Sequence, residues 1–281
     1  MNISAFTTGL MICTSLLMSG CTVKGIANSN ISVEGNDAKP TVNKTVKIGD
    51  FNEIEASQGI KVIFVQDANT GIAEVSTTPS AEKYLNVEVK DKTLKAYYSN
   101  SGLRGNMKIK GPSIIRVSSP VLNEVDLSSA ANVSIEGQLN VKGNFEIELS
   151  SASSFEADML SCKELDAELS SSASANIGDL RGNLDVEVSS ASSISVGNLK
   201  GNVDAEASSA ASIKIGSIKS SSIKAEASSA SSIYIDGIAG GNVDASASSG
   251  AKIKLSGKAD NIKQNSSSGG SVDYKSLSVA R

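Results

Sequence analysis

The stretch VDAEASSAASIKIG (residues 203–216) decides the fold, because near copies of it recur along the chain. LDVEVSSASSISVG occupies residues 184–197 and IKAEASSASSIYID occupies residues 223–236. A Ser-Ser pair followed by Ala, Gly or Ser returns every 19–22 residues, with its first serine at Ser128, Ser150, Ser170, Ser189, Ser208, Ser228, Ser248 and Ser267. Repetition with this period is typical of a solenoid, in which each repeat forms one coil stacked on the next.

Within each repeat the apolar residues recur at every second position. Val203, Ala205 and Ala207 alternate with Asp204 and Glu206, which is typical of short strands with one buried face. Serine-rich runs such as Ala-Ser-Ser-Ala-Ser-Ser are poor helix formers, because serine competes for backbone hydrogen bonds. The sequence therefore predicts an all-β fold, a single-stranded parallel β-helix of about eight coils with a more irregular β N-terminal part. Right-handed winding is expected from the chirality of parallel crossovers.

Glycine and asparagine recur at fixed places in the repeat. Gly-Asn occurs at 143–144, 182–183, 201–202 and 241–242, and a second glycine stands at Gly178, Gly197 and Gly216. We expect corners there, where the backbone needs positive φ. At Ser-Ser-Ala we expect a bend whose small side chains allow close stacking and whose hydroxyls bond along the stack or to the freed backbone. A ladder of nucleophilic serines is disfavoured by the eight copies and by the absence of histidine.

Composition excludes several classes of function. The chain of 281 residues has no histidine and no tryptophan, and its net charge is −4. Histidine is the commonest general base and a frequent metal ligand, so the chain lacks a residue that many hydrolase mechanisms and zinc sites require. Without a basic run there is no electrostatic footprint for nucleic acid. The lone Cys162 of the main body has no histidine anywhere in the chain to activate it, and we interpret it as a small packing residue.

The N-terminus has the features of an export signal. Residues 1–20 are uncharged and apolar, too short for a convincing membrane span, and end in small residues before Cys21. LLMSGC (16–21) resembles a bacterial lipobox, which implies cleavage after residue 20 and acylation of Cys21, with palmitate among the acyl chains. The alternative is an ordinary secretory signal followed by an incidental cysteine. Residues 21–45 are polar and predict a flexible tether. We expect a lipid-anchored envelope protein, at the outer membrane.

The region after the tether has longer alternating strands. It contains Phe51, Ile54 and Gly59, the strands IKVIFVQ (60–66) and LNVEVKDKTLKAYY (85–98), and hairpin-like turns at DANTG (67–71) and KDKT (90–93). Followed by Ser-Ala repeats, this opening resembles the bacterial family called "putative autotransporter adhesin, head GIN domain". The resemblance covers residues 46–275 as a head GIN-like β-helix domain and leaves 276–281 as a tail. It implies an exported β-helix, often a lipoprotein, with an adhesin function.

Carboxylates form two outward columns if the coils stack in register. They stand two and four residues before the repeated serines, and the candidate binding face comprises Glu148, Glu168, Glu187, Glu206, Glu226, Asp166, Asp185 and Asp204. One interpretation is a solvated face that also discourages aggregation of sheets. The other is a surface for divalent cations or for a basic or cation-bridged polymer. The aspartate-glycine turn repeats of calcium-binding β-rolls are absent, so we expect no cofactor and at most weak divalent cation binding.

Together these features predict a membrane-anchored exported lipoprotein with a non-catalytic β-helix rod. Its surface would serve as an adhesin-like binding face or an envelope scaffold, with a polysaccharide, a matrix component or an envelope protein as partner. The alternative is a carbohydrate-active β-helix enzyme acting on an envelope or extracellular polysaccharide. Carboxylates could supply its acid and base. However, the repeat offers no distinctive pair, and Arg104, Arg116, Arg181 and Arg281 form no motif with acids and aromatics.

Overall fold

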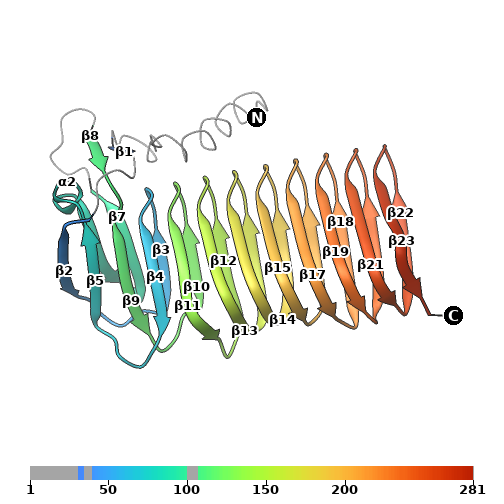
Figure 1. Cartoon of the computed structure of the whole chain (residues 1–281), viewed down its shortest axis with the longest axis horizontal. Helices are drawn as coiled ribbons and strands as arrows, with labels where there is room; N and C mark the ends of the chain where they lie inside the picture. Colours follow the sequence, from blue (N-terminus) through green and yellow to red (C-terminus); the bar gives the residue numbers. More distant parts are fainter. Residues whose placement is uncertain (1–30, 35–39, 100–106, 281) are drawn as a thin grey trace. The chain divides into compact units, whose positions relative to one another are not determined.

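The computed structural model describes residues 31–34, 40–99 and 107–280. In this part the protein is all-β apart from the short helix α2 (Pro79–Glu82), and it forms a parallel β-solenoid of about eight turns with an irregular N-terminal part (Figure 1). The fold predicted from the repeat is therefore confirmed. The chain divides into two compact units, residues 1–136 with 150–154 and residues 137–149 with 155–281.

The first unit combines parallel and antiparallel pairing. Its strands are β1 (Ile31–Glu34), β2 (Val42–Lys47), β3 (Glu53–Ala56), β4 (Lys61–Gln66), β5 (Ile72–Thr77), β6 (Leu85–Lys90), β7 (Thr93–Tyr98), β8 (Met107–Lys110), β9 (Ile114–Ser119), β10 (Glu124–Leu127) and the start of β11 (Asn132–Asn140). β3 lies between β7 and β10, parallel to both, and β6 returns antiparallel to β7. β1 and β8 form a separate parallel pair.

One of the two expected hairpins is present and the other is not. At KDKT, Lys90 pairs with Thr93, and Asp91 and Lys92 turn the chain with φ of 53° and 69°. The prediction at DANTG was wrong. β4 pairs in parallel with β9, and β5 pairs antiparallel with the same β9, so β9 lies between the two strands that the turn connects. Local turn chemistry could not reveal a strand inserted from about forty residues further along the chain.

The second unit is regular. Its strands are β12 (Phe145–Leu149), β13 (Ser154–Leu169), β14 (Ser174–Val188), β15 (Ser193–Lys200), β16 (Val203–Ala207), β17 (Ser212–Lys219), β18 (Ser222–Ala227), β19 (Ser232–Ala239), β20 (Asn242–Ala247), β21 (Lys252–Ala259), β22 (Asn261–Ser266) and β23 (Ser271–Val279). Each coil pairs in parallel with the next, so that β14, β16, β18, β20 and β22 form one ladder. β14, β15, β17, β19, β21 and β23 form the other.

The Ser-Ser-Ala segments are tight turns of unusual backbone conformation. In the turn at residues 208–211, Ser209 and Ala210 have φ of 54° and 64°, and the Ala211 amide donates to the Ser208 carbonyl at 3.1 Å. Two consecutive positive φ values closed by such a bond are the signature of a type I′ turn, which normally uses Gly, Asn or Asp. All eight Ser-Ser segments close in this way. Ser57-Gln58-Gly59 forms a further turn of the same kind that the serine repeat did not reveal.

Within each unit, backbone hydrogen bonds join each of these turns to its neighbour. The Ala210 amide donates to the Ser229 carbonyl at 3.0 Å, and the Ala191 amide donates to the Ser209 carbonyl at 3.0 Å. The Ser208 amide donates back to the Val188 carbonyl at 2.9 Å. We call this repeated set of bonds the turn ladder. Serine hydroxyls support it where the side chain is buried, as when Ser231 Oγ donates to the Ala207 carbonyl at 2.8 Å.

The second set of recurring glycines serves close stacking, whereas Gly182, Gly201 and Gly241 of the Gly-Asn pairs have the expected positive φ. Gly178, Gly197 and Gly216 do not have positive φ, so the expected reason for them was wrong. A Cβ placed on Gly197 would lie 2.6 Å from the Gly178 carbonyl oxygen, and one on Gly216 would lie 2.5 Å from that of Gly197. Real Cβ atoms do not approach an oxygen this closely, so any side chain at these positions must push two coils apart.

The interior is built from thin apolar layers. Paired inward positions such as Val186, Ala205 and Ala225 are almost completely buried. Larger side chains gather early in each unit, where Phe51 packs edge-on to Phe64 in the first and Phe145 packs against Phe155 in the second. Small residues in the later layers limit the stabilisation from burial, which makes the backbone pairing more important.

Replacing Gly197 by alanine should destabilise the second unit, because the new Cβ meets a backbone oxygen that cannot move without opening the stack. We expect a loss of about 1–3 kcal/mol in unfolding free energy, as for overpacking of a core. Chemical denaturation would measure it. Gly143→Ala is the matched control, because a Cβ there has open space around it and should change stability little. Equal stability of the two variants would contradict the close-stacking explanation.

Candidate binding face

The eight carboxylates named from the sequence lie on adjacent strands in two outward columns. We call them the acidic face. Each alternates with a buried residue of the interior, so all eight point away from the core. Strand register confirms the neighbours expected from stacking, and the paired positions include Glu148–Glu168, Glu187–Glu206–Glu226 and Asp185–Asp204. Neighbouring carboxylates in a column are therefore separated by roughly one strand spacing, about 4.8 Å.

Crowding of like charges changes the acidity of these groups. The pKa of Asp185 is raised, first by partial desolvation and then by the charges of Asp204 and Asp166. The pKa of Glu187 is also raised first by desolvation and then by neighbouring charges, of which Glu206 and Glu168 contribute most. In the part of the chain that the structure describes, no lysine or arginine forms an ion pair with either group. This section of the acidic face therefore keeps its negative charge.

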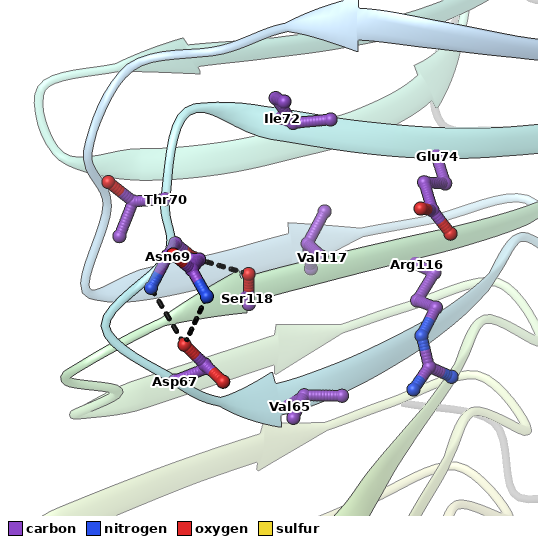
Figure 2. A pocket seen from close by; sticks show the side chains of 9 residues that line it. All are labelled: Val65, Asp67, Asn69, Thr70, Ile72, Glu74, Arg116, Val117 and Ser118. Atoms are coloured by element: carbon purple, nitrogen blue, oxygen red, sulfur yellow. Dashed lines mark hydrogen bonds between the residues drawn. The ribbon is translucent and has the colours of Figure 1, made fainter.

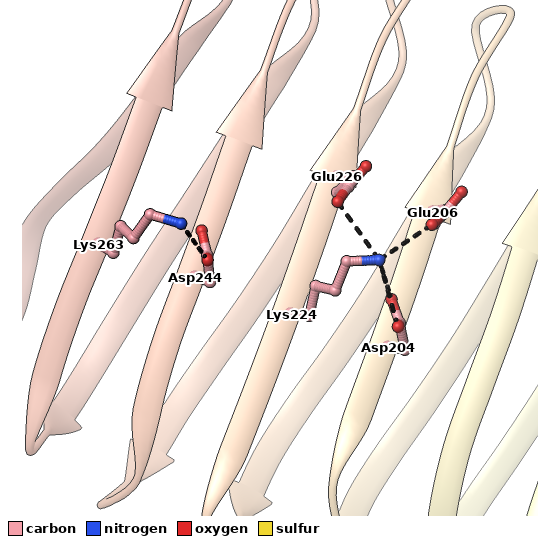
Figure 3. Close-up of polar contacts among 6 residues, drawn as sticks. All are labelled: Asp204, Glu206, Lys224, Glu226, Asp244 and Lys263. Carbon is pink, nitrogen blue, oxygen red and sulfur yellow. Dashed lines mark hydrogen bonds and ion pairs between the residues drawn. The ribbon is translucent and has the colours of Figure 1, made fainter.

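The acidic face is neutralised where Lys224 interrupts one column (Figure 3). Lys224 Nζ lies 3.1 Å from Asp204 Oδ1, 3.1 Å from Glu206 Oε1 and 3.3 Å from Glu226 Oε1. These contacts raise the pKa of Lys224, with the bond to Asp204 as the largest cause. The exposed ion pairs add little stability individually, but they cancel part of the charge.

One further pair lies beyond this network. Lys263 Nζ lies 2.8 Å from Asp244 Oδ2, in the same column as Lys224 and Asp204 (Figure 3). Aspartate and lysine therefore alternate along the column from Asp204 onward. The continuous negative surface is consequently shorter than the sequence suggested, since Glu206 and Glu226 belong to it only in part.

The described residues contain no group of three or more His, Cys, Asp or Glu side chains arranged to hold a metal ion. A column places carboxylates in a line, whereas Ca²⁺ requires six to eight oxygen ligands converging on one point. Diffuse attraction of counterions is what this arrangement can provide.

A shallow hollow of about 300 Å³ lies in the first unit, where the DANTG turn passes over β9 (Figure 2). Asp67 Oδ1 accepts hydrogen bonds from the Asn69 backbone amide at 2.8 Å and from Asn69 Nδ2 at 2.9 Å. Among the described residues that line it, Arg116 is the one cation; it is paired with Glu136, which also raises the pKa of Arg116. Its polar groups are thus largely satisfied. The sequence did not predict this hollow, because it depends on the insertion of β9.

Cys162 and Cys21 are the two cysteines that follow the predicted signal. Cys162 is buried, and desolvation raises its pKa to about 11, with a smaller contribution from Glu164. A thiol with so high a pKa is a poor nucleophile at neutral pH, which agrees with a packing role.

Cys21, the expected lipidation site, lies outside the described residues. No helix in the described ranges has the length and apolar character needed to span a bilayer.

Comparison with known proteins identifies a family. A family model described as "Putative auto-transporter adhesin, head GIN domain" matches residues 50–239 and 203–281. No curated protein matches the chain.

Three of the solved structures of similar fold come from Parabacteroides. A protein of P. distasonis described as a "putative lipid binding protein" has a TM-score of 0.71 at 18% identity, over 89% of this chain and 100% of that one. A "putative adhesin" from P. distasonis has a TM-score of 0.67 at 20% identity, over 86% and 99%. Another from P. merdae has 0.66 at 18%, over 89% and 99%. At these identities the likeness shows the fold alone.

Removing charge from the acidic face should stabilise the protein at neutral pH. The variant Asp185→Asn/Glu187→Gln should gain a few tenths of a kcal/mol per site, the size of like-charge interactions across neighbouring strands. Because the folded-state pKa values are raised, the repulsion is present above them and disappears as pH falls through them. The advantage should therefore vanish below the ordinary pKa values of Asp and Glu, as measured by denaturation at pH 7 and about pH 3. Glu156→Gln, on β13 outside the two columns of the acidic face, should change nothing at either pH. A wild type no less stable than the double variant at pH 7 would contradict this account.

Proposed function

The chain belongs to the family described as "Putative auto-transporter adhesin, head GIN domain", and we propose that it is an exported lipoprotein whose solenoid is a non-catalytic, adhesin-like binding surface. The observation that carries the proposal is the in-register repetition of outward side chains over successive coils. Solenoids commonly use such extended surfaces for binding. Envelope scaffolding would use the same surface and is the closest variant of this function.

The surface is suited to multivalent contact rather than to catalysis. Asp185 and Glu187 and their column neighbours repeat one chemical group at one spacing, and no pair among them stands apart as an acid and a base. Catalytic pairs need different environments that push their two pKa values apart. Here the pKa values of both groups move in the same direction. A basic protein or a cation-bridged polymer is the partner that this charge would attract.

Anchoring would come from the segment before the solenoid. The lipobox-like LLMSGC places an acylated Cys21 about twenty-five residues before the family domain, with residues 21–45 as the tether. Each buried methylene contributes about 0.8 kcal/mol, so several acyl chains would hold the protein firmly at the outer membrane. Display on the outer surface would then allow contact with a matrix or with another cell.

Protease digestion of intact cells tests both display and anchoring. We expect the solenoid to be cleaved on intact cells expressing the wild type. In cells expressing Cys21→Ser it should be absent from the membrane fraction, because the acylation site is lost. Cys13→Ser is the matched control, since Cys13 lies inside the predicted signal and should have no effect on localisation.

Two results would count against the proposal. Protection from protease until the outer membrane is opened would exclude surface adhesion and favour a periplasmic scaffold. Retention of Cys21→Ser in the membrane fraction would refute lipid anchoring through this cysteine.

A further inference from the structure

The second unit carries another charged face, of opposite sign to the acidic face. Six exposed lysines lie on β15, β17 and β21, and we call them the basic face; its members are Lys200, Lys214, Lys219, Lys252, Lys254 and Lys258. Register pairs Lys200 directly with Lys219. The other lysines are spaced along the axis by uncharged residues: Lys214 and Lys254 both pair with Tyr234, Lys252 pairs with Ser232, and Lys258 pairs with Ala239. Figure 1 shows β15, β17 and β21 following one another along this unit, with β19 between β17 and β21.

The lysines of the basic face are not neutralised by the protein. None of them forms an ion pair with any of the described residues, whereas Lys224 and Lys263 each bind carboxylates. The neighbouring carboxylates make other bonds. Asp236 Oδ1 accepts from Ser256 Oγ at 3.0 Å, and Asp273 Oδ1 accepts from the Lys275 backbone amide at 3.2 Å. Although the chain has a net charge of −4, this surface therefore presents an excess of positive charge.

An aromatic ring interrupts one of the lysine columns. Register places Tyr234 of β19 between Lys214 of β17 and Lys254 of β21, and all three side chains point outward. With about 4.8 Å between strands, the two lysines lie roughly 10 Å apart along the axis of the unit. A parallel column two residues earlier consists of Ser193, Ser212 and Ser232, which present hydroxyls.

These groups match the chemistry of a charged sugar chain. Tyrosine offers an apolar face for stacking on a sugar ring, together with a polar edge. Lysine attracts carboxylate or sulfate as a mobile point charge, which tolerates variation along a polymer. Serine hydroxyls can bond to sugar hydroxyls. Because the groups repeat along the axis, a linear ligand would meet the same set of contacts at successive coils.

We propose that the basic face, centred on Lys214, Tyr234 and Lys254, binds an anionic polysaccharide that lies along the axis of the second unit. A membrane surface fits less well, because interfacial binding needs apolar side chains that insert. The large hydrophobic side chains exposed among the described residues are Ile72, Val121, Tyr274 and Val279, and none lies on β15, β17, β19 or β21. Tyr274 and Val279 lie on the last strand, β23, next to β21. The site is separate from the acidic face and does not depend on the function proposed for it.

Binding of the full-length protein, purified in detergent, to immobilised polygalacturonate tests this assignment. Polygalacturonate is a linear polymer of carboxylated sugars, and neutral dextran serves as the reference surface. We expect Lys214→Glu/Lys254→Glu to weaken binding at least about tenfold, because two charge-assisted contacts become repulsive. Tyr234→Ala, which leaves the net charge unchanged, should weaken binding several-fold through loss of stacking.

Lys142→Glu/Lys163→Glu is the matched control, with the same change of net charge at exposed lysines elsewhere in the same unit. It should retain most of the binding. Circular dichroism of each variant verifies that the fold is intact, and Lys214→Gln/Lys254→Gln provides a milder substitution. Three results would overturn the proposal: equal binding of the wild type to dextran, equal losses in the control and the test pair, or unchanged binding of Tyr234→Ala. The last result would indicate attraction to any polyanion rather than recognition of a sugar.

Discussion

The hydrogen bond between one Ser-Ser-Ala turn and the next is the interaction on which the rest of the structure depends. Each turn holds two residues at positive φ, as in Ser209 and Ala210, at a cost of about 1–2 kcal/mol per residue. It gains the bond that closes it and the two bonds of the turn ladder, each worth about 1 kcal/mol net. With all three bonds the gains are similar to the cost, whereas an isolated turn keeps only its closing bond and is unfavourable. Stacking provides the bonds that make this conformation favourable.

The turn ladder sets the register of neighbouring strands, and that register decides which side chains lie next to one another on the surface. When the Ser208 amide bonds to the Val188 carbonyl, Glu206 is placed beside Glu187 and Ala207 beside Val188. Each repeated residue type therefore becomes a column, either buried or exposed. The protein carries the carboxylates of the acidic face on one ladder of strands and the lysines of the basic face on the other. Lys224 shows how a single substitution in a column changes its charge over three strands.

Much of the fold and part of the candidate site could be predicted from the sequence, because a parallel stack converts a one-dimensional period into columns. The inward column through Val188 and Ala207 and the outward column through Glu187 and Glu206 were both predicted. The backbone conformation was not, since serine and alanine rarely adopt positive φ and only stacking makes it favourable. The glycines at Gly178 and Gly197 were assigned to the wrong cause, because the distance between coils is not visible in a sequence. The insertion of β9 and the pairing of Lys224 likewise depend on contacts between distant segments.

Amide hydrogen exchange in the turns tests the central claim most directly. The amides of Ala191, Ala210 and Ala230 donate to the carbonyls of the next turn, whereas the amides of Ser190, Ser209 and Ser229 have no acceptor among the described residues. The account predicts slow exchange at each of these alanines and fast exchange at the serine immediately before it. Fast exchange at both residues would show that the turns are independent loops, and would contradict a solenoid whose register is set by the turn ladder.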